Sequence, residues 1–223
     1  GIVIVGVMLV SLNVPDVQAQ DLNDDTLRES VKLAITQGQR FLKSKQLGDG
    51  SFNTEFEAAN SVGANSLVGL ALITSGIEPS DPVIQKCLRF VRTRPATENT
   101  YDLGAAIMFY AAAGEAQDKP RIRQMASILV NDQLEDGGWG YGKARDPDPD
   151  NSTTQFAILG LRDAAFHTGM EIDQDVWRRA REHWIKTQSG TPAAFRGAGW
   201  PYVAGQPERG SMTVAGLASL EII

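Results

Sequence analysis

The sequence predicts an all-α protein built from repeated helix–turn–helix units. Segments with helical periodicity alternate between two kinds, one amphipathic and one apolar nearly all round. A motif of glutamine, a glycine-rich turn and an aromatic residue recurs between them, whereas the period-two alternation typical of strands is nearly absent. A single helix pair cannot bury its own apolar face, so we expect the pairs to stack side by side.

The first residues are expected to form a leader peptide and not to join the fold. The apolar run Ile2–Leu12 is too short to span a bilayer and is typical of a signal-peptide core. The polar stretch that follows ends in Val17-Gln18-Ala19, a small-residue cleavage site. Because the chain begins at Gly1 without a positively charged segment, we predict an N-terminally incomplete signal peptide over residues 1–20. Export to the periplasm, the envelope or the medium follows; a buried core segment is the alternative.

Residues 21–223 are predicted to form one domain of about four outer and inner helix pairs. The outer segments are amphipathic, and the inner ones are rich in glycine and alanine, which permits close approach of their backbones. The expected outer helices are Asp25–Gln46, Pro82–Thr93, Pro120–Leu134 and Asp173–Gln188, and the expected inner helices are Ala64–Ser75, Tyr101–Ala113, Thr153–Thr168 and Met212–Ile223.

Local signals support these elements one by one. In the first outer segment the apolar residues recur three or four positions apart and face away from Arg28 and Lys32. That apolar face comprises Leu27, Val31, Ala34, Ile35, Phe41 and Leu42. The pair Asp81-Pro82 places a capping side chain before a proline at the first helical position of the second outer segment. Gly76, Gly114 and Gly169 each follow an inner segment, as expected of left-handed caps.

The turn motif has two clear copies and one weaker copy. In the weaker copy an insertion separates the glutamine from its glycines and aromatic. We expect the glutamine to hydrogen-bond backbone groups at helix ends, the glycines to permit positive φ or close approach, and the aromatic ring to be buried between repeats. Aromatics that line a pocket are the alternative. The motif residues are Gln46, Phe52, Gln133, Gly137, Gly138, Trp139 and Gln188.

At these turns the chain resembles the terpenoid cyclase and protein prenyltransferase superfamily, and most of all its squalene-cyclase-type repeats. The resemblance covers Leu27–Ile223. It implies an (α/α) toroid whose inner helices surround a cavity, with their N-terminal ends at one mouth. Such a toroid has about six helix pairs. We therefore expect a partial barrel that is truncated at its C-terminus; the alternatives are a barrel that stays open or one that closes through an oligomer.

The residues that carry the family's chemistry have no match here. The D-x-D-D acid motif of squalene-type cyclases is missing, and the nearest string, Asp146-Pro147-Asp148-Pro149-Asp150, reads as a solvated loop whose end caps the next helix. Calcium binding by that loop is an alternative. For zinc, Cys87 lies on an apolar helix face, and His167 and His183 show no metal-like spacing to it. The Cys-Gly-Glu-Gln string of thioester domains is also missing, so we expect neither a metal nor a cofactor.

Six residues are candidate ligand contacts at the cavity mouth. They open an inner segment, lie in the acidic loop, or stand just past a turn motif. For Asp102 the plain reading is a first-turn carboxylate that the helix dipole stabilises, with the cavity mouth as the alternative. For the aromatic candidates the alternative is structural packing. The candidates are Tyr101, Asp102, Tyr141, Asp148, Trp200 and Tyr202.

The sequence favours an exported, non-catalytic module that binds a ligand or partner or acts as a scaffold. The formal net charge of −6 argues against a nucleic-acid partner. The expected partner is an apolar small molecule, a glycan or a protein, and contact with a membrane is expected only through the leader. The alternative is a cyclase-like or polysaccharide-lyase-like enzyme whose acids are absent or lie outside this segment, an idea that rests on fold analogy. Enzymatic activity is thus left open.

Overall fold

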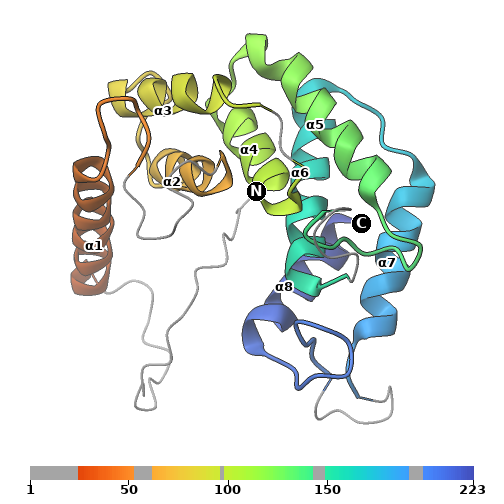
Figure 1. The fold of residues 1–223 in the computed structure, drawn as a ribbon. Helices are drawn as coiled ribbons and strands as arrows, with labels where there is room; N and C mark the ends of the chain where they lie inside the picture. The colour runs from red at the N-terminus through yellow and green to blue at the C-terminus, as the bar shows by residue number, and fades with distance from the viewer. Residues whose placement is uncertain (1–24, 53–61, 96–97, 143–148, 191–197) are drawn as a thin grey trace.

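The computed structural model describes residues 25–52, 62–95, 98–142, 149–190 and 198–223, and within these residues the protein is all-helical (Figure 1). It contains eight α-helices and one short 3₁₀ helix. In the same residues β-type pairing between two described partners is limited to the isolated bridges Gln46–Phe52 and Trp200–Arg209. The predicted all-α class is therefore confirmed. The predicted leader, residues 1–20, lies outside the described part of the chain.

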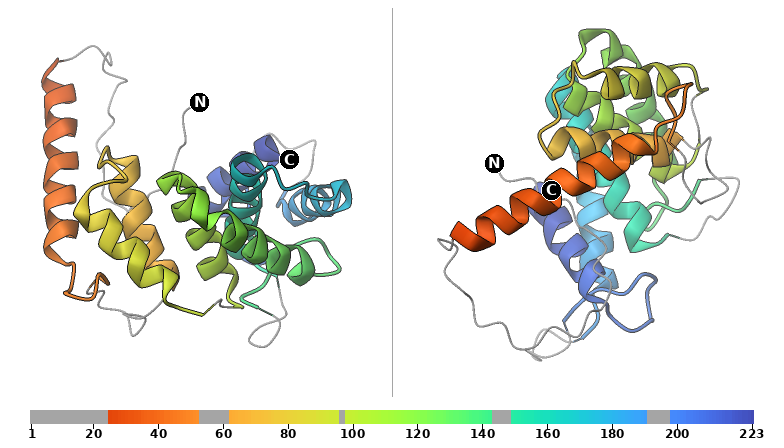
Figure 2. Two further views of the ribbon diagram at one scale, coloured as in Figure 1. Left: turned by 90° about the horizontal axis from the view of Figure 1, so that it is seen from above. Right: turned by 90° about the vertical axis from the view of Figure 1, so that its left-hand side faces the viewer.

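The helices form two rows (Figures 1 and 2). Consecutive helices of the inner row make the most extensive contacts, and the outer helices flank them in an arch. The inner row comprises α2 (Val62–Thr74), α4 (Thr100–Ala113), α6 (Asn151–Thr168) and α8 (Gly210–Ile222). The outer row comprises α1 (Asp25–Ser44), α3 (Pro82–Arg92), α5 (Lys119–Asp132) and α7 (Gln174–Thr187), and the 3₁₀ helix η1 (Ala116–Asp118) precedes α5.

The helix ends follow the predicted local signals. Asp81 caps α3 by accepting a 2.9 Å hydrogen bond from the Val83 N–H. Gly114 and Gly169 end α4 and α6 in the left-handed conformation, with φ of 73° and 69°. Asp150 caps α6 by accepting from the Thr153 N–H. Because such caps are set by neighbouring residues, the sequence placed most helix ends within a few positions of where they lie.

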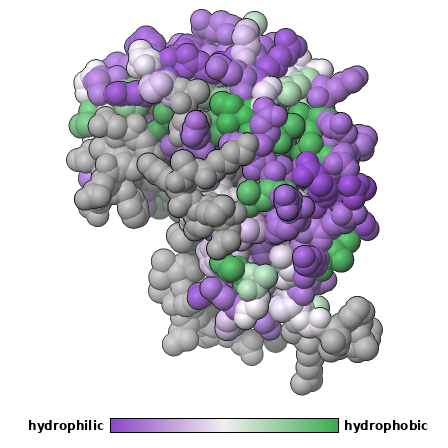
Figure 3. All heavy atoms as spheres, turned by 45° about the vertical axis from the view of Figure 1, so that its right-hand side comes forward, coloured by the Kyte–Doolittle hydropathy of each residue, from purple (hydrophilic) through white to green (hydrophobic). Residues whose placement is uncertain are grey.

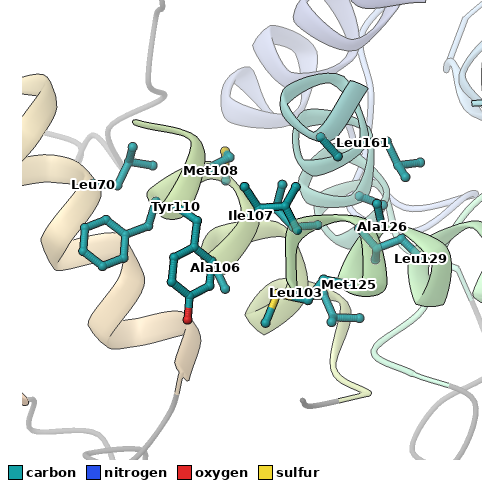
Figure 4. Close-up of a cluster of buried hydrophobic side chains, with 14 of the residues drawn as sticks. Leu70, Leu103, Ala106, Ile107, Met108, Tyr110, Met125, Ala126, Leu129 and Leu161 are labelled. Atoms are coloured by element: carbon teal, nitrogen blue, oxygen red, sulfur yellow. The ribbon is translucent and has the colours of Figure 1, made fainter. Parts of the chain in front are cut away.

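Glycines let the inner helices approach closely. A Cβ atom on Gly104 of α4 would lie 2.5 Å from the Phe156 carbonyl oxygen of α6, and one on Gly160 of α6 would lie 3.0 Å from the Gly104 Cα. Around this crossing α2, α4, α5 and α6 enclose the core, as Figure 4 shows for Leu103, Ile107, Leu129 and others. Close backbone approach offsets the usual cost of glycine inside a helix.

An ion-pair cluster joins α3 to η1, in the repeat unit where the turn motif is missing. The Arg92 guanidinium donates to Asp118 at 2.5 and 2.9 Å and to Glu115 at 2.6 Å. The Asp118 side chain is buried, and its hydrogen bond with Arg92 raises the pKa of that arginine although burial opposes the shift. Such a pair stabilises only when both partners are present.

The first helix, α1, departs from the prediction that its apolar face would be buried. Leu27, Val31 and Ile35 are 40%, 49% and 44% exposed, and α1 has no fully buried residue. Gln39 and Lys43 face the rest of the chain instead, donating to Ser75 and Asp81. Periodicity identifies an apolar face but not the neighbour that covers it, and in Figure 2 α1 stands at one end of the array.

The face of the molecule drawn in Figure 3 is mainly polar. On the side drawn in Figure 3 hydrophilic side chains predominate, with hydrophobic patches among them. No helix in the described ranges has the length and apolar character needed to cross a membrane.

Candidate functional site

The glutamines of the turn motif tie successive outer helices together. Gln133 donates from Nε2 to the Gly137 carbonyl in its own turn and to the Val176 carbonyl in the first turn of α7, both at 2.9 Å. Gln46 does the same with Gly50, at 3.2 Å, and with Val83 of α3, at 2.8 Å. These side chains are therefore engaged in the architecture of the two clear copies.

The turn tryptophans are buried and bonded to the preceding outer helix. The indole N–H of Trp139 donates to the Leu129 carbonyl at 2.7 Å, and that of Trp200 donates to the Trp184 carbonyl at 2.7 Å. Trp200 is only 3% exposed, so its ring lies in the core and not at a mouth. The third copy keeps this contact despite its insertion.

The main chain of each turn aromatic is held by the inner helix that follows. In all three copies its N–H donates to a polar side chain at the fourth residue of that helix, at 2.7 to 3.1 Å. The acceptors are Asn65 of α2, Thr154 of α6 and Thr213 of α8. These three residues therefore occupy equivalent positions and give the register between the helices.

Three of the candidate ligand residues gather at the N-terminal ends of α4 and α6. The ring of Tyr101, in the first turn of α4, lies 5.6 Å from the ring of Tyr141 and 4.6 Å from that of Phe156. Tyr141 follows the turn after α5 and is 39% exposed. Tyr202, after α7, is half-buried and adds to the electrostatic environment of Tyr101. We name Tyr101, Tyr141, Phe156 and Tyr202 the aromatic cluster.

A chain of hydrogen bonds through hydroxyl groups links Tyr101 of the cluster to the N-cap residue of α6. The Tyr101 hydroxyl donates to Ser152 Oγ at 2.5 Å, and Ser152 Oγ donates to Asp150 Oδ1 at 2.6 Å. Burial raises the pKa of Tyr101, and the hydrogen bond with Ser152 only partly opposes that shift. A tyrosine is protonated in neutral solution in any case, so the phenol is a neutral hydrogen-bonding group beside an apolar ring face.

A cation borders the cluster at Tyr202. The guanidinium carbon of Arg209 lies 5.7 Å from the centre of the Tyr202 ring. The Tyr202 carbonyl accepts a 2.8 Å hydrogen bond from the Asn151 N–H at the start of α6. This bond fixes the loop after α7 against the end of α6, and it places Tyr202 on the same side of the fold as Tyr101.

Of the remaining candidates, Asp102 has a structural partner. Asp102 accepts a 2.8 Å hydrogen bond from the Gly63 N–H in the first turn of α2, where helix N–H groups lack intrahelical partners. It thus joins two inner helices at their N-terminal ends. Asp148 lies outside the described residues. The sequence did not identify Ser152, Phe156 or Asp150 as neighbours of Tyr101, because the chain separates Ser152 from Tyr101 by 51 positions.

A buried histidine joins α7 to α6 and to the turn after α5, and the sequence did not predict this structural role. His183 of α7 is 2% exposed; its Nδ1 lies 3.1 Å from Asp136 Oδ2, and its Nε2 lies 3.1 Å from Asn151 Oδ1. Asn151 also donates from Nδ2 to the Pro201 carbonyl at 2.8 Å. The only sequence signal was a histidine on a helix face next to a tryptophan.

Asp136 gives this histidine contact a testable pH dependence. Burial opposes ionisation of Asp136, but hydrogen bonds with His183 and the Gly138 N–H outweigh it and lower the pKa below 3.8. A lowered folded-state pKa contributes stability that is present above the unfolded value and lost as the pH falls through the folded one. We expect Asp136→Asn to cost about 1 kcal/mol near neutral pH, since the side chain is partly exposed, and the cost to shrink below about pH 4.

Denaturant unfolding across this pH range measures the effect. Asp49→Asn shows the same turn position without a histidine, since Asp49 accepts from Ser51 where Asp136 accepts from Gly138. Hydrogen bonds with Ser51 also lower the pKa of Asp49, so its cost is expected to shrink over the same acidic range. A cost for Asp136→Asn that stays constant down to strongly acidic pH would contradict the assignment.

Other groups considered for chemistry have structural surroundings. Cys87 is buried, as the sequence predicts, and burial raises its pKa to about 12. Asp163 is partly buried; burial raises its pKa, although Arg162, 2.7 Å away, opposes the shift. Among the described residues no group of three or more histidine, cysteine, aspartate or glutamate side chains could hold a metal ion.

Comparison with known proteins assigns no family. No protein-family model matches the sequence, and no curated protein matches it either.

Proposed function

We propose that the chain is an exported, non-catalytic binding module, a partial (α/α) toroid of squalene-cyclase-type repeats whose ligand contacts the aromatic cluster. The observation that carries this proposal is the gathering of Tyr101 and Tyr141 with Phe156 at the N-terminal ends of α4 and α6. This is the end of the inner helices at which the family resemblance predicts a mouth.

The chemistry of the cluster favours a ligand that has both apolar faces and hydroxyl groups. Aromatic rings offer flat apolar surfaces, and tyrosine adds a polar tip. The half-exposed Tyr141 ring supplies the accessible face, and the Tyr101 and Ser152 hydroxyls supply hydrogen-bonding groups. A glycan fits this combination better than an isoprenoid, which lacks hydroxyl groups to pair.

The surroundings of the carboxylate that ends the hydroxyl chain favour binding over catalysis. Asp150 Oδ1 accepts from the Ser152 hydroxyl and from the Thr153 N–H, at 2.6 and 2.8 Å, in its role as the cap of α6. An acid that is held in this way is poorly placed to exchange protons with a ligand, because a catalytic acid must reach the reacting atom.

Calorimetric titration with cello-, xylo- and chito-oligosaccharides tests the proposal. We expect one series to bind and Tyr141→Ala to weaken that binding about tenfold, the scale of a lost aromatic contact. Phe166→Ala is the matched control, because Phe166 is 94% exposed near the opposite end of α6. If the protein bound squalene-containing vesicles and none of the oligosaccharides, the ligand would be an isoprenoid and not a glycan. Cleavage of a bound oligosaccharide would contradict the non-catalytic role and favour the lyase-like alternative.

A further inference from the structure

The buried imidazole ring of His183 faces a hydrogen-bond acceptor at each of its two nitrogens. Nδ1 lies 3.1 Å from Asp136 Oδ2 and Nε2 lies 3.1 Å from Asn151 Oδ1, and the residue is only 2% exposed. A neutral imidazole has one N–H group and one bare nitrogen, so it can donate to only one of these oxygens. The other contact would set a nitrogen lone pair against an oxygen in a place that water does not reach.

The orientation of the Asn151 amide is fixed by a third residue. Its Nδ2 donates to the Pro201 carbonyl at 2.8 Å, so the amide turned over would bring its own oxygen against that carbonyl. The Thr187 hydroxyl also donates to Asn151 Oδ1, at 3.2 Å. The oxygen of this amide therefore faces His183, and the contact requires a proton on Nε2.

The contact at the other nitrogen requires a proton as well. Asp136 Oδ1 accepts from the Gly138 N–H at 3.0 Å, which leaves Oδ2 for the ring. Burial opposes ionisation of Asp136, but its hydrogen bonds with His183 and Gly138 lower the pKa of the carboxyl. At neutral pH the side chain is thus a carboxylate, which only accepts, and His183 Nδ1 must donate to it.

The other charged side chains near the ring do not oppose this arrangement strongly. On α7 itself Arg179 pairs with Asp175 at 3.1 Å, and Lys186 is exposed, so solvent screens its charge. At the start of α6 the Asp150 carboxylate is engaged by Ser152 and the Thr153 N–H. Asp136 is therefore the charged group that the ring contacts, and its charge favours an imidazolium.

We propose that His183 is held in the fold as an imidazolium, with a proton on each ring nitrogen, and that it is a pH-sensitive clamp on the loop after α7. Its Nε2 proton holds Asn151, and Asn151 holds the loop through the Pro201 carbonyl and, from its backbone N–H, through the Tyr202 carbonyl at 2.8 Å. Loss of either proton as the pH rises leaves two acceptors facing each other, so this contact must rearrange. The charge state follows from these contacts alone; only an effect of the clamp on ligand affinity rests on the proposed function.

Nitrogen NMR of the protein labelled with ¹⁵N tests the charge state, because protonated and bare ring nitrogens have well-separated chemical shifts. We expect both nitrogens of His183 to carry a proton at neutral pH; His167 is the only other histidine and gives a reference in the same spectrum. In Asp136→Asn an amide N–H can donate to Nδ1, so His183 is expected to become neutral with its one proton on Nε2. Asp49→Asn, which changes the same turn position without a histidine, should leave both protons on His183.

A pH titration of the same samples tests the clamp. In the wild-type protein the side-chain amide signals of Asn151 and the backbone amide signal of Tyr202 should shift together with the ring nitrogens of His183. A bare ring nitrogen on wild-type His183 at neutral pH, or two protons retained in Asp136→Asn, would overturn the charge assignment. Ring nitrogens that titrate while the Asn151 and Tyr202 signals stay fixed would overturn the clamp. The wild-type spectra decide both points if the variant does not fold, and no ligand is present, so failure of the binding proposal is a separate result.

Discussion

Replacing Gly137 with alanine is expected to lower the free energy of unfolding by about 3 kcal/mol. Gly137 has a φ of 90°, a conformation that residues with a side chain rarely adopt. An added Cβ would also lie 2.1 Å from the Arg179 carbonyl oxygen of α7. Because this neighbour is helix backbone, relief of the clash would require the turn to move away from α7.

Gly169→Ala separates the two contributions to that cost. Gly169 also has a positive φ, 69°, but nothing lies within 4 Å of its added Cβ, so we expect a loss of about 1 kcal/mol. Denaturant unfolding of both variants measures the difference. Equal losses would show that the approach of the turn to α7 is not as close as described.

Trp139→Ala is expected to have the largest effect of any single substitution discussed for this protein, a loss of about 3–5 kcal/mol. The Trp139 side chain is fully buried, and its indole N–H donates to the Leu129 carbonyl. Truncation would therefore leave both a cavity and a carbonyl without that partner. Thermal and denaturant unfolding measure the loss, and a change below about 1 kcal/mol would contradict the buried position.

Trp139→Phe serves as the graded control for this substitution. The first copy of the motif already carries Phe52, which is 1% exposed, at the equivalent place. A phenyl ring keeps most of the packing and removes only the indole donor, so we expect a loss of about 1–2 kcal/mol. If Trp139→Phe lost as much stability as Trp139→Ala, packing of an aromatic ring would not be the main contribution of Trp139.

The features that the sequence predicted well are those set by neighbouring residues. The caps at Asp81 and Gly114 lie where a side chain or a left-handed residue ends a helix, and these signals operate over a few positions. The turn motif belongs to the same class, since Gln133 and Gly137 are four positions apart. Local spacing was therefore sufficient to place these elements.

Features that depend on distant residues were not predictable from one sequence. His183 meets Asp136 across 47 positions, and nothing in the local pattern links the two. Leu27 and Val31 carried the pattern of a buried face, yet they are exposed because burial depends on a neighbour that periodicity cannot show. The third copy of the motif looked weak in the sequence because of its insertion. In the structure Trp200 nevertheless makes the hydrogen bonds typical of the motif.

The candidate site depends on the same contacts as the fold. Asp150 caps α6 and also ends the hydroxyl chain that begins at Tyr101. These helix ends thus hold the Tyr101 hydroxyl in place, and under the proposed binding role this would reduce the ordering cost of binding.

The motif glutamines join successive outer helices, and comparison of Gln133→Ala with Gln188→Ala tests this role most directly. Gln133 bonds both its own turn and the first turn of α7, whereas the exposed Gln188 donates to the Ala198 carbonyl in its own turn at 3.3 Å. Denaturant unfolding should show a loss of about 2 kcal/mol for Gln133→Ala and less than about 0.5 kcal/mol for Gln188→Ala. Equal losses for the two variants would contradict the claim.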